Sequence, residues 1–442
     1  MVVRRLNAAS VRLKVIANVD LLLNSGLLAV SAAGSAAIGF VFWWLAARFH
    51  SAEQLGLASA AISAMSLLGT VGDLGLGTFA MAAIHRTARS ASLISTCVLA
   101  AALSSGLFGV AFLFLGVRIS QELASFLDGP VRGAVFVAGV SACGVALVLD
   151  HVLAGLVRSS LQLMRNLSAS LLKCAALGGA IVWGSGDSIT VVIASTFGVS
   201  ASIPVVLAIC VRRKYPVVAM PTPHLLKGMC GAILGHHALN LTTQVVGLLL
   251  PLIVTALVSA RANGAFFAAW MIVQVWCLGP AALATMFFPI VSKDASRFSN
   301  MMQLTLLLSL GISIVGELFL IGFGRGILSL LNRDLVTEGY AALVVLGAGI
   351  FPAALKYHFV ALRRIQGRPG GASASMGVAA VFEIGCAMIG AYLGDALGLS
   401  LGYLFAVFVQ ALIIGPVLYR AMRGGCGLLQ QEAGNENLDS FA

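Results

Sequence analysis

Residues 71–81 read VGDLGLGTFAM and interrupt the apolar segment 55–83 with a carboxylate, Asp73, and with Gly72, Gly75 and Gly77. The segment is long enough to cross a bilayer, since about 20 apolar residues suffice. Each glycine weakens a helix by about 1 kcal/mol relative to alanine, and small residues let membrane helices approach closely. We therefore expect a packed hinge here, with Asp73 accepting backbone N–H groups at the start of a second half-helix. A proton or Na⁺ site at Asp73, or direct substrate contact, is the alternative.

The rest of the chain has the composition of a membrane protein. Of its 442 residues, 60% are hydrophobic and only 10% are charged, and its mean hydropathy is +1.01. Soluble domains carry about 25% charged residues, and lipid excludes open sheet edges. The sequence therefore predicts an all-α polytopic membrane protein of about 12 transmembrane helices. These segments are 22–47, 55–83, 91–117, 131–157, 166–184, 189–211, 226–258, 264–291, 302–322, 339–362, 370–392 and 399–419.

The distribution of charge predicts the orientation in the membrane. The net charge is +11. If the N-terminus is cytoplasmic, most lysines and arginines fall in the inner loops, as the positive-inside rule requires. We therefore expect both termini in the cytoplasm. Because the basic residues are scattered over loop ends and form no single patch, they do not indicate nucleic-acid binding.

The chain divides near its middle. We expect an amphipathic N-terminal segment at 1–22, a six-helix lobe at 23–211, a basic cytoplasmic linker at 212–225, a second lobe at 226–423 and a cytoplasmic tail at 424–442. The two halves share a pattern. Ser51, Ala52 and Gly56 recur as Ser259, Ala260 and Gly264, and His151 recurs as His358 at nearly the same spacing. Duplicated halves with the binding site between them are typical of secondary transporters.

Several stretches, in this order, resemble bacterial polysaccharide flippases of the multidrug/oligosaccharidyl-lipid/polysaccharide exporter superfamily. They are GFVFWWLAAR at 39–48, SAEQLG at 51–56, DLGLGT at 73–78, NGAFFAAW at 263–270, PAALATMFFP at 280–289 and FPAALKYHFVALRRIQG at 351–367. The resemblance implies two six-helix lobes around a central cavity that opens alternately to each side. It implies transfer of a polyprenyl-diphosphate-linked oligosaccharide across the bacterial inner membrane. It also implies a polysaccharide polymerase and a chain-length regulator as partners, besides membrane lipids.

Two lysines within predicted spans are candidates for binding the diphosphate. Burying a charge at the centre of a spanning helix costs about 2.5–3.5 kcal/mol, so an intramembrane cation is a functional candidate. We expect Lys173 a turn or two inside the inner face and Lys356 at similar depth in the other half. Snorkelling of either lysine to the lipid headgroups is the alternative.

Other polar residues within the spans are candidates for coupling and for sugar binding. Glu383 lies near the middle of its segment and could carry a coupling ion, as could Asp73, while pairing of Glu383 with a basic residue is the rival interpretation. Asn240 and Gln244 are four residues apart, and they share a helix face that could line a hydrophilic cavity or bond a neighbouring helix. Asp150 and His151 suggest a polar cluster with Arg158.

The sequence gives no indication of catalysis. It contains no nucleophile elbow, zinc-protease motif or phosphate-binding loop, and neither His236–His237 nor the eight cysteines have metal-ligand spacing. We therefore expect a protein that is not an enzyme and has no metal or cofactor. Two alternatives to the flippase stay open. One is a cation-coupled drug or metabolite antiporter of the same superfamily, and the other is a membrane-embedded polysaccharide polymerase or ligase.

Overall fold

A computed structural model describes residues 34, 37–116, 120–184, 186–215, 217–228, 231–293, 298–366 and 369–439. Within these ranges the chain forms helices and connections and no β-strand. The expected amphipathic segment 1–22 lies outside the described residues. A first helix spans Ala37–Phe49. The elements after it are α2 (Ala52–Gly72), α3 (Leu76–Ala83), α4 (Ser90–Leu115), α5 (Gln121–Leu127), α6 (Pro130–Gly155), α7 (Ser159–Val182), α8 (Ile189–Arg212), η2 (Pro223–Gly228), α9 (Gly231–Leu257), α10 (Ala260–Lys293), α11 (Phe298–Leu331), α12 (Asp334–Ala348), α13 (Ile350–Ile365) and α14 (Pro369–Asp439).

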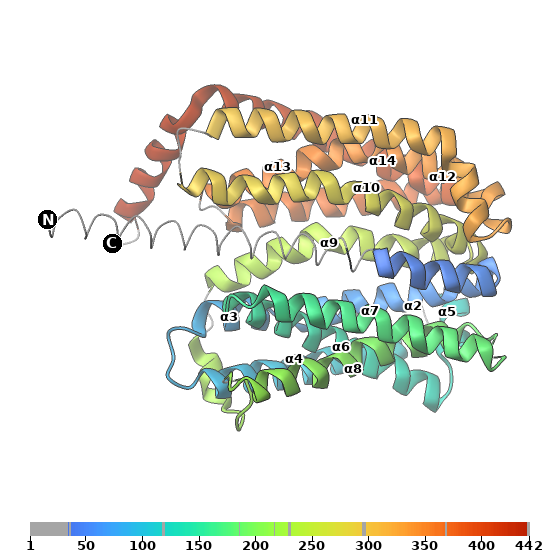
Figure 1. The fold of residues 1–442 in the computed structure, drawn as a ribbon. Coiled ribbons are helices and arrows are strands. Elements are labelled where there is room, and N and C mark those ends of the chain that lie inside the picture. The colour runs from blue at the N-terminus through green and yellow to red at the C-terminus, as the bar shows by residue number, and fades with distance from the viewer. Residues whose placement is uncertain are drawn as a thin grey trace, which may run out of the picture.

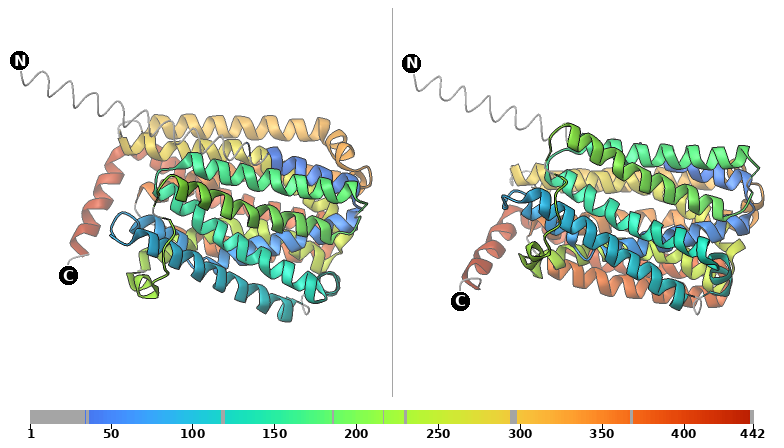
Figure 2. Two further views of the ribbon diagram at one scale, coloured as in Figure 1. Left: turned by 60° about the horizontal axis from the view of Figure 1, so that its bottom comes forward. Right: turned by 90° about the horizontal axis from the view of Figure 1, so that it is seen from below.

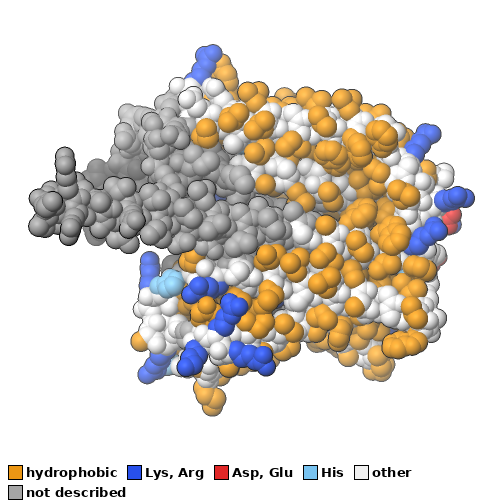
Figure 3. All heavy atoms as spheres, viewed as in Figure 1, with side chains coloured by type: hydrophobic (Ala, Val, Ile, Leu, Met, Phe, Trp, Pro, Cys, Tyr) orange, Lys and Arg blue, Asp and Glu red, His pale blue; other side chains and the backbone are white. Residues whose placement is uncertain are grey.

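The predicted all-α polytopic membrane fold is confirmed. Eight helices of the described chain are long and apolar enough to cross a membrane, or nine if the bent pair α12 and α13 counts as one span. Hydrophobic side chains cover the middle of the visible face, whereas lysines and arginines gather toward its ends (Figure 3). The protein is therefore a multi-pass membrane protein.

The helices form two groups with α9 between them. Helices α2–α8 lie in one group and α10–α14 in the other, all running along one direction (Figure 1). In both views of Figure 2 the last part of α14 projects from the bundle. Helix α2 packs against both α9 and α10, and so joins the groups at their centre. The division of the sequence at 212–225 stays a prediction.

One end of the bundle is basic. Here α3 ends, α4 begins and α8 ends, and Arg86, Arg89, Arg212, Arg213 and Lys214 are exposed. We call this the basic end. The starts of α2 and α10 lie at the opposite end. The depth of a residue in the bundle can therefore be given as its distance along a helix from the basic end.

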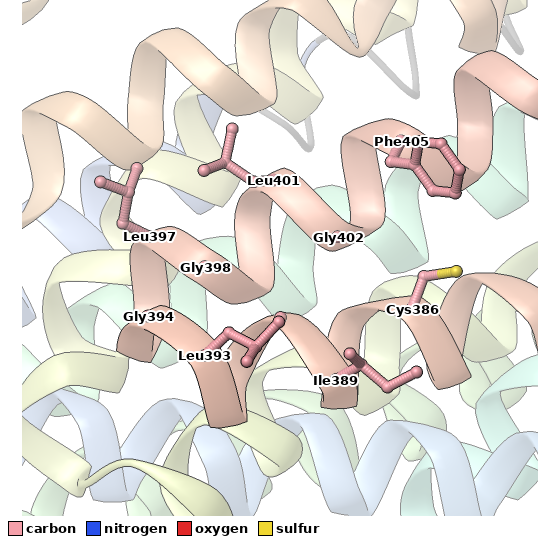
Figure 4. Close-up of a pocket in the computed structure, with 10 residues that line it drawn as sticks. Cys386, Ile389, Leu393, Gly394, Leu397, Gly398, Leu401, Gly402 and Phe405 are labelled. Carbon is pink, nitrogen blue, oxygen red and sulfur yellow. The ribbon is translucent and has the colours of Figure 1, made fainter.

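Helix α14 contains the last two predicted spans as a hairpin. The chain reverses at Asp395, where φ is +55°, and the arms then touch along glycines. A Cβ on Gly390 would collide with the carbonyl oxygen of Gly398, and a Cβ on Gly398 with that of Gly390. Figure 4 shows the two arms side by side, bordering an apolar hollow of about 540 Å³.

Candidate functional site

The helix break lies where the sequence places it. Helix α2 ends at Gly72 and α3 begins at Leu76. Leu74 has a φ of +49° and Gly75 a φ of +80°, a region that glycine adopts without strain. The Oδ1 atom of Asp73 accepts a hydrogen bond from the Gly77 N–H at 3.0 Å. The buried carboxylate thus satisfies a backbone donor freed by the break.

Tight packing surrounds this break. A Cβ on Gly72 would collide with Ser105 of α4, and one on Gly77 would lie 2.8 Å from the His151 ring of α6. The glycines therefore let α2 and α3 approach two neighbouring helices. Bending at this position during transport stays a prediction.

Asp73 also connects the first group of helices to α9. Its Oδ2 atom lies 3.3 Å from Nδ1 of His237 on α9. The two side chains are 4% and 13% exposed, so the contact is largely shielded from water. The sequence could not indicate a partner for His237, because Asp73 and His237 are far apart in the chain. The ion-coupling role considered for Asp73 stays a prediction.

Lys356 and Glu383 form a buried ion pair. The Lys356 Nζ atom lies 2.6 Å from Glu383 Oε1, with side-chain exposures of 15% and 1%. Lys356 lies about 14 Å from the end of α13 at the basic end, and Glu383 lies deeper, about 20 Å along α14. A candidate for diphosphate binding is therefore paired with the leading candidate for ion coupling. This is the arrangement that the rival interpretation of Glu383 describes.

Lys173 lies near the middle of α7. Helix α7 begins at Ser159, before the expected start of the span at 166, so Lys173 is about 20 Å from the basic end of α7. Its expected depth of one or two turns inside the inner face stays a prediction. The Lys173 ammonium lies 5.1 Å from the ring centre of the buried Phe42. Among the residues that the structure describes, no carboxylate pairs with it.

The polar residues of α9 are partly accessible. Gln244 is exposed, and its Nε2 donates to the Asn240 carbonyl oxygen at 3.4 Å. The Asn240 side chain accepts a hydrogen bond through Oδ1 from Nη2 of Arg364 at 3.1 Å. Arg364, which belongs to α13, was not among the residues expected to bind substrate. Because Arg364 lies next to Arg363 at the end of a predicted span, the sequence did not indicate that it contacts Asn240.

A second buried ion pair lies within the first group of helices. Arg165 of α7 contacts both carboxylate oxygens of Asp150 on α6, at 2.8 and 2.6 Å. The expected cluster of Asp150 with Arg158 was wrong, since the Arg158 guanidinium instead lies 4.9 Å from the ring centre of Tyr215. The described residues hold no group of three histidine, cysteine or acidic side chains able to bind a metal.

The contact between α2 and α10 at the opposite end is nearly two-fold symmetric. A Cβ on Gly56 would collide with the carbonyl oxygen of Ala260, and a Cβ on Gly264 with that of Ala52. These are the residues that recur between the two halves of the sequence. Asn263 strengthens the contact by donating to the Gly56 carbonyl oxygen at 2.8 Å. The two groups of helices are thus closely packed at the end of the bundle opposite the basic end.

The model of a family described as polysaccharide biosynthesis protein matches residues 21–295. The chain belongs to this family. The suspected membership of the exporter superfamily is thereby confirmed, whereas no curated protein matches the sequence.

Solved structures of known proteins share the fold of this chain. An inward-facing multidrug resistance MATE family transporter of the MOP superfamily is 14% identical with a TM-score of 0.65, over 91% of this chain and 95% of that chain. A solved complex of the MATE multidrug transporter DinF-BH gives the same values. An outward-facing MATE transporter is 14% identical with a TM-score of 0.61, over 93% and 96%. At this identity the likeness establishes the fold alone.

Proposed function

We propose that this protein is a flippase that moves a polyprenyl-diphosphate-linked oligosaccharide across the bacterial inner membrane for surface polysaccharide export. Membership of the polysaccharide biosynthesis family supports the substrate class. The observation that carries the proposal is Lys173, a cation near the middle of α7 whose described surroundings offer an aromatic ring and no carboxylate. An uncompensated charge at this depth is costly, and an anionic substrate would compensate it.

The residues of α9 fit the sugar part of this substrate. Asn240 and Gln244 present amide groups that both donate and accept hydrogen bonds, as sugar hydroxyls require. The polyprenyl chain would stay in the lipid beside the bundle. Transport would proceed by alternating access, with the α2–α10 contact opening and the break at Asp73 bending.

The charge distribution supports a cytoplasmic basic end. Under the positive-inside rule, the exposed bases at Arg86, Arg89 and 212–214 face the cytoplasm, and both chain termini lie on that side. A polysaccharide polymerase and a chain-length regulator would act on the product at the outer face.

A cation-coupled antiporter is the second candidate, since the solved relatives are multidrug transporters. Glu317 of α11 favours it, because its Oε2 atom is buried and has no hydrogen-bond partner among the described residues. The other buried acids weigh against it. Asp73, Asp150 and Glu383 each have a basic partner within the described chain, which leaves them less able to attract a cationic drug.

The test is deletion of the gene in its native host. The flippase is expected to be required for surface polysaccharide, so the lipid-linked repeat unit accumulates in the cytoplasmic leaflet of the deletion strain. Complementation with wild type restores the polymer, and complementation with Lys173→Gln does not. Normal polymer together with a changed sensitivity to cationic drugs would instead support the antiporter.

A further inference from the structure

Arg364 reaches from α13 across to α9. It lies in the last turn of α13, its side chain is exposed, and its Nη2 atom donates to Asn240 Oδ1 at 3.1 Å. The neighbouring Arg363 stays on its own helix. Its guanidinium lies 5.1 Å from the ring centre of Phe359, and its Nη1 atom donates to Gln366 at 3.1 Å. Adjacent arginines thus have different surroundings.

The partner of Arg364 leaves its charge uncompensated. Arg165 and Lys356 each contact a carboxylate, at 2.6 Å in both cases. Arg364 contacts a neutral amide, and the described part of the chain places no carboxylate against it. A guanidinium carries five N–H donors, so one bond to Asn240 leaves a pair free for two oxygens of a phosphate.

We infer that Arg364, oriented by Asn240, binds the diphosphate of the substrate at the basic end of the bundle. This inference rests on the proposed function and assigns to Arg364 a role that the sequence suggested for Lys356. Lys356 is the poorer anion site because Glu383 already neutralises it. The Asn240 bond holds the planar guanidinium in place, which lowers the entropy lost when the phosphate binds.

A simpler role for an arginine at this position is interaction with the helix C-terminus or with lipid phosphates. That role requires no bond to another helix, and Arg363 would fulfil it equally. The two neighbours therefore provide a matched pair of variants. Each loses one positive charge, one sequence position apart.

The experiment measures binding of farnesyl diphosphate to the purified full-length protein in phosphatidylcholine nanodiscs. Arg364→Gln is expected to bind about tenfold more weakly, the value for loss of a charge-assisted hydrogen bond. Asn240→Asp is expected to weaken binding similarly, because the new carboxylate would neutralise Arg364. Arg363→Gln is expected to bind like wild type, and added phosphatidylglycerol should not displace the ligand.

Two results would show that binding of the ligand is not specific to Arg364 and would overturn the inference, as would normal binding by Arg364→Gln. One is equal weakening by the Arg364 and Arg363 variants, and the other is displacement of farnesyl diphosphate by phosphatidylglycerol, since either indicates general attraction to lipid phosphates. Melting temperatures of all variants identify any that misfold, and Arg364→Lys, which keeps the charge and loses the forked geometry, then replaces Arg364→Gln. If Arg364→Gln restores polymer and binds normally, this inference fails and the flippase stands. If the deletion strain accumulates no lipid-linked repeat unit, the proposed function itself fails.

Discussion

Separate removal of each partner in the Lys356–Glu383 pair should destabilise the protein unequally. Lys356→Met leaves a carboxylate that is 1% exposed without its cation. Breaking a buried pair in this way costs about 3–5 kcal/mol. Insertion scales give about 2.5–3.5 kcal/mol for a charge at the centre of a spanning helix. We therefore expect about 3 kcal/mol for Lys356→Met.

The opposite substitution should be milder. Glu383→Leu leaves the Lys356 side chain, which is 15% exposed and long enough to turn its ammonium toward water. We expect a loss of about 1–2 kcal/mol, the value for one lost charged hydrogen bond. The double variant Lys356→Met/Glu383→Leu replaces the pair by apolar side chains, which is often neutral. It should therefore be more stable than Lys356→Met alone.

The assay is thermal unfolding of the purified variants in one detergent. The expected order of melting temperatures is Lys356→Met lowest, Glu383→Leu next, and the double variant closest to wild type. Lys214→Met is the control, since Lys214 is exposed and surface substitutions change stability by at most about 0.5 kcal/mol. A double variant that loses the sum of both single losses would show that the two side chains do not depend on each other. That result would refute the reasoning.

Three further predictions concern the packed glycines, the helix break and the deep cation. Gly56→Ala should destabilise the protein by about 1–3 kcal/mol and so lower its melting temperature. Gly178→Ala is the control and should leave the melting temperature unchanged, since a Cβ on Gly178 would meet no atom within 4 Å. Equal melting temperatures of the two variants would contradict the close α2–α10 contact. Asp73→Ala should cost about 1 kcal/mol more than Asp73→Asn, which keeps an acceptor for the first turn of α3, and identical unfolding of the two would argue against the cap. Lys173→Arg should retain part of the polymer export that Lys173→Gln loses, as measured by surface polysaccharide; full export by the glutamine variant would remove Lys173 from the transport path.

Hydropathy and local spacing predicted the features that depend on neighbouring residues. The spanning helices, the break at 72–75 and the cap by Asp73 follow from residue types within one or two turns. The recurring Gly56 and Gly264 indicated duplicated halves, and only the structure shows that they lie in the α2–α10 contact. These inferences succeeded because lipid restricts the chain to helices, and because only glycine permits so close a backbone approach.

Features that depend on distant residues could not be predicted. Nothing near Glu383 in the sequence indicates Lys356 as its partner, and nothing near Asp73 indicates His237. The start of α7 at Ser159 was also missed, because Arg165, whose charge truncated the predicted span, lies within α7 and pairs with Asp150. A hydropathy profile counts such a paired charge as though it faced lipid.

The hairpin within α14 has a consequence for biogenesis. Its arms meet backbone to backbone at Gly390 and Gly398, and the reversal is confined to the few residues around Asp395. So short a connection cannot extend across the bilayer while one arm waits outside, because a span covers about 30 Å. The two arms must therefore leave the insertion machinery together, as one preassembled unit. A bulky residue at Gly398 would then impair insertion of the protein into the membrane, a step that precedes transport.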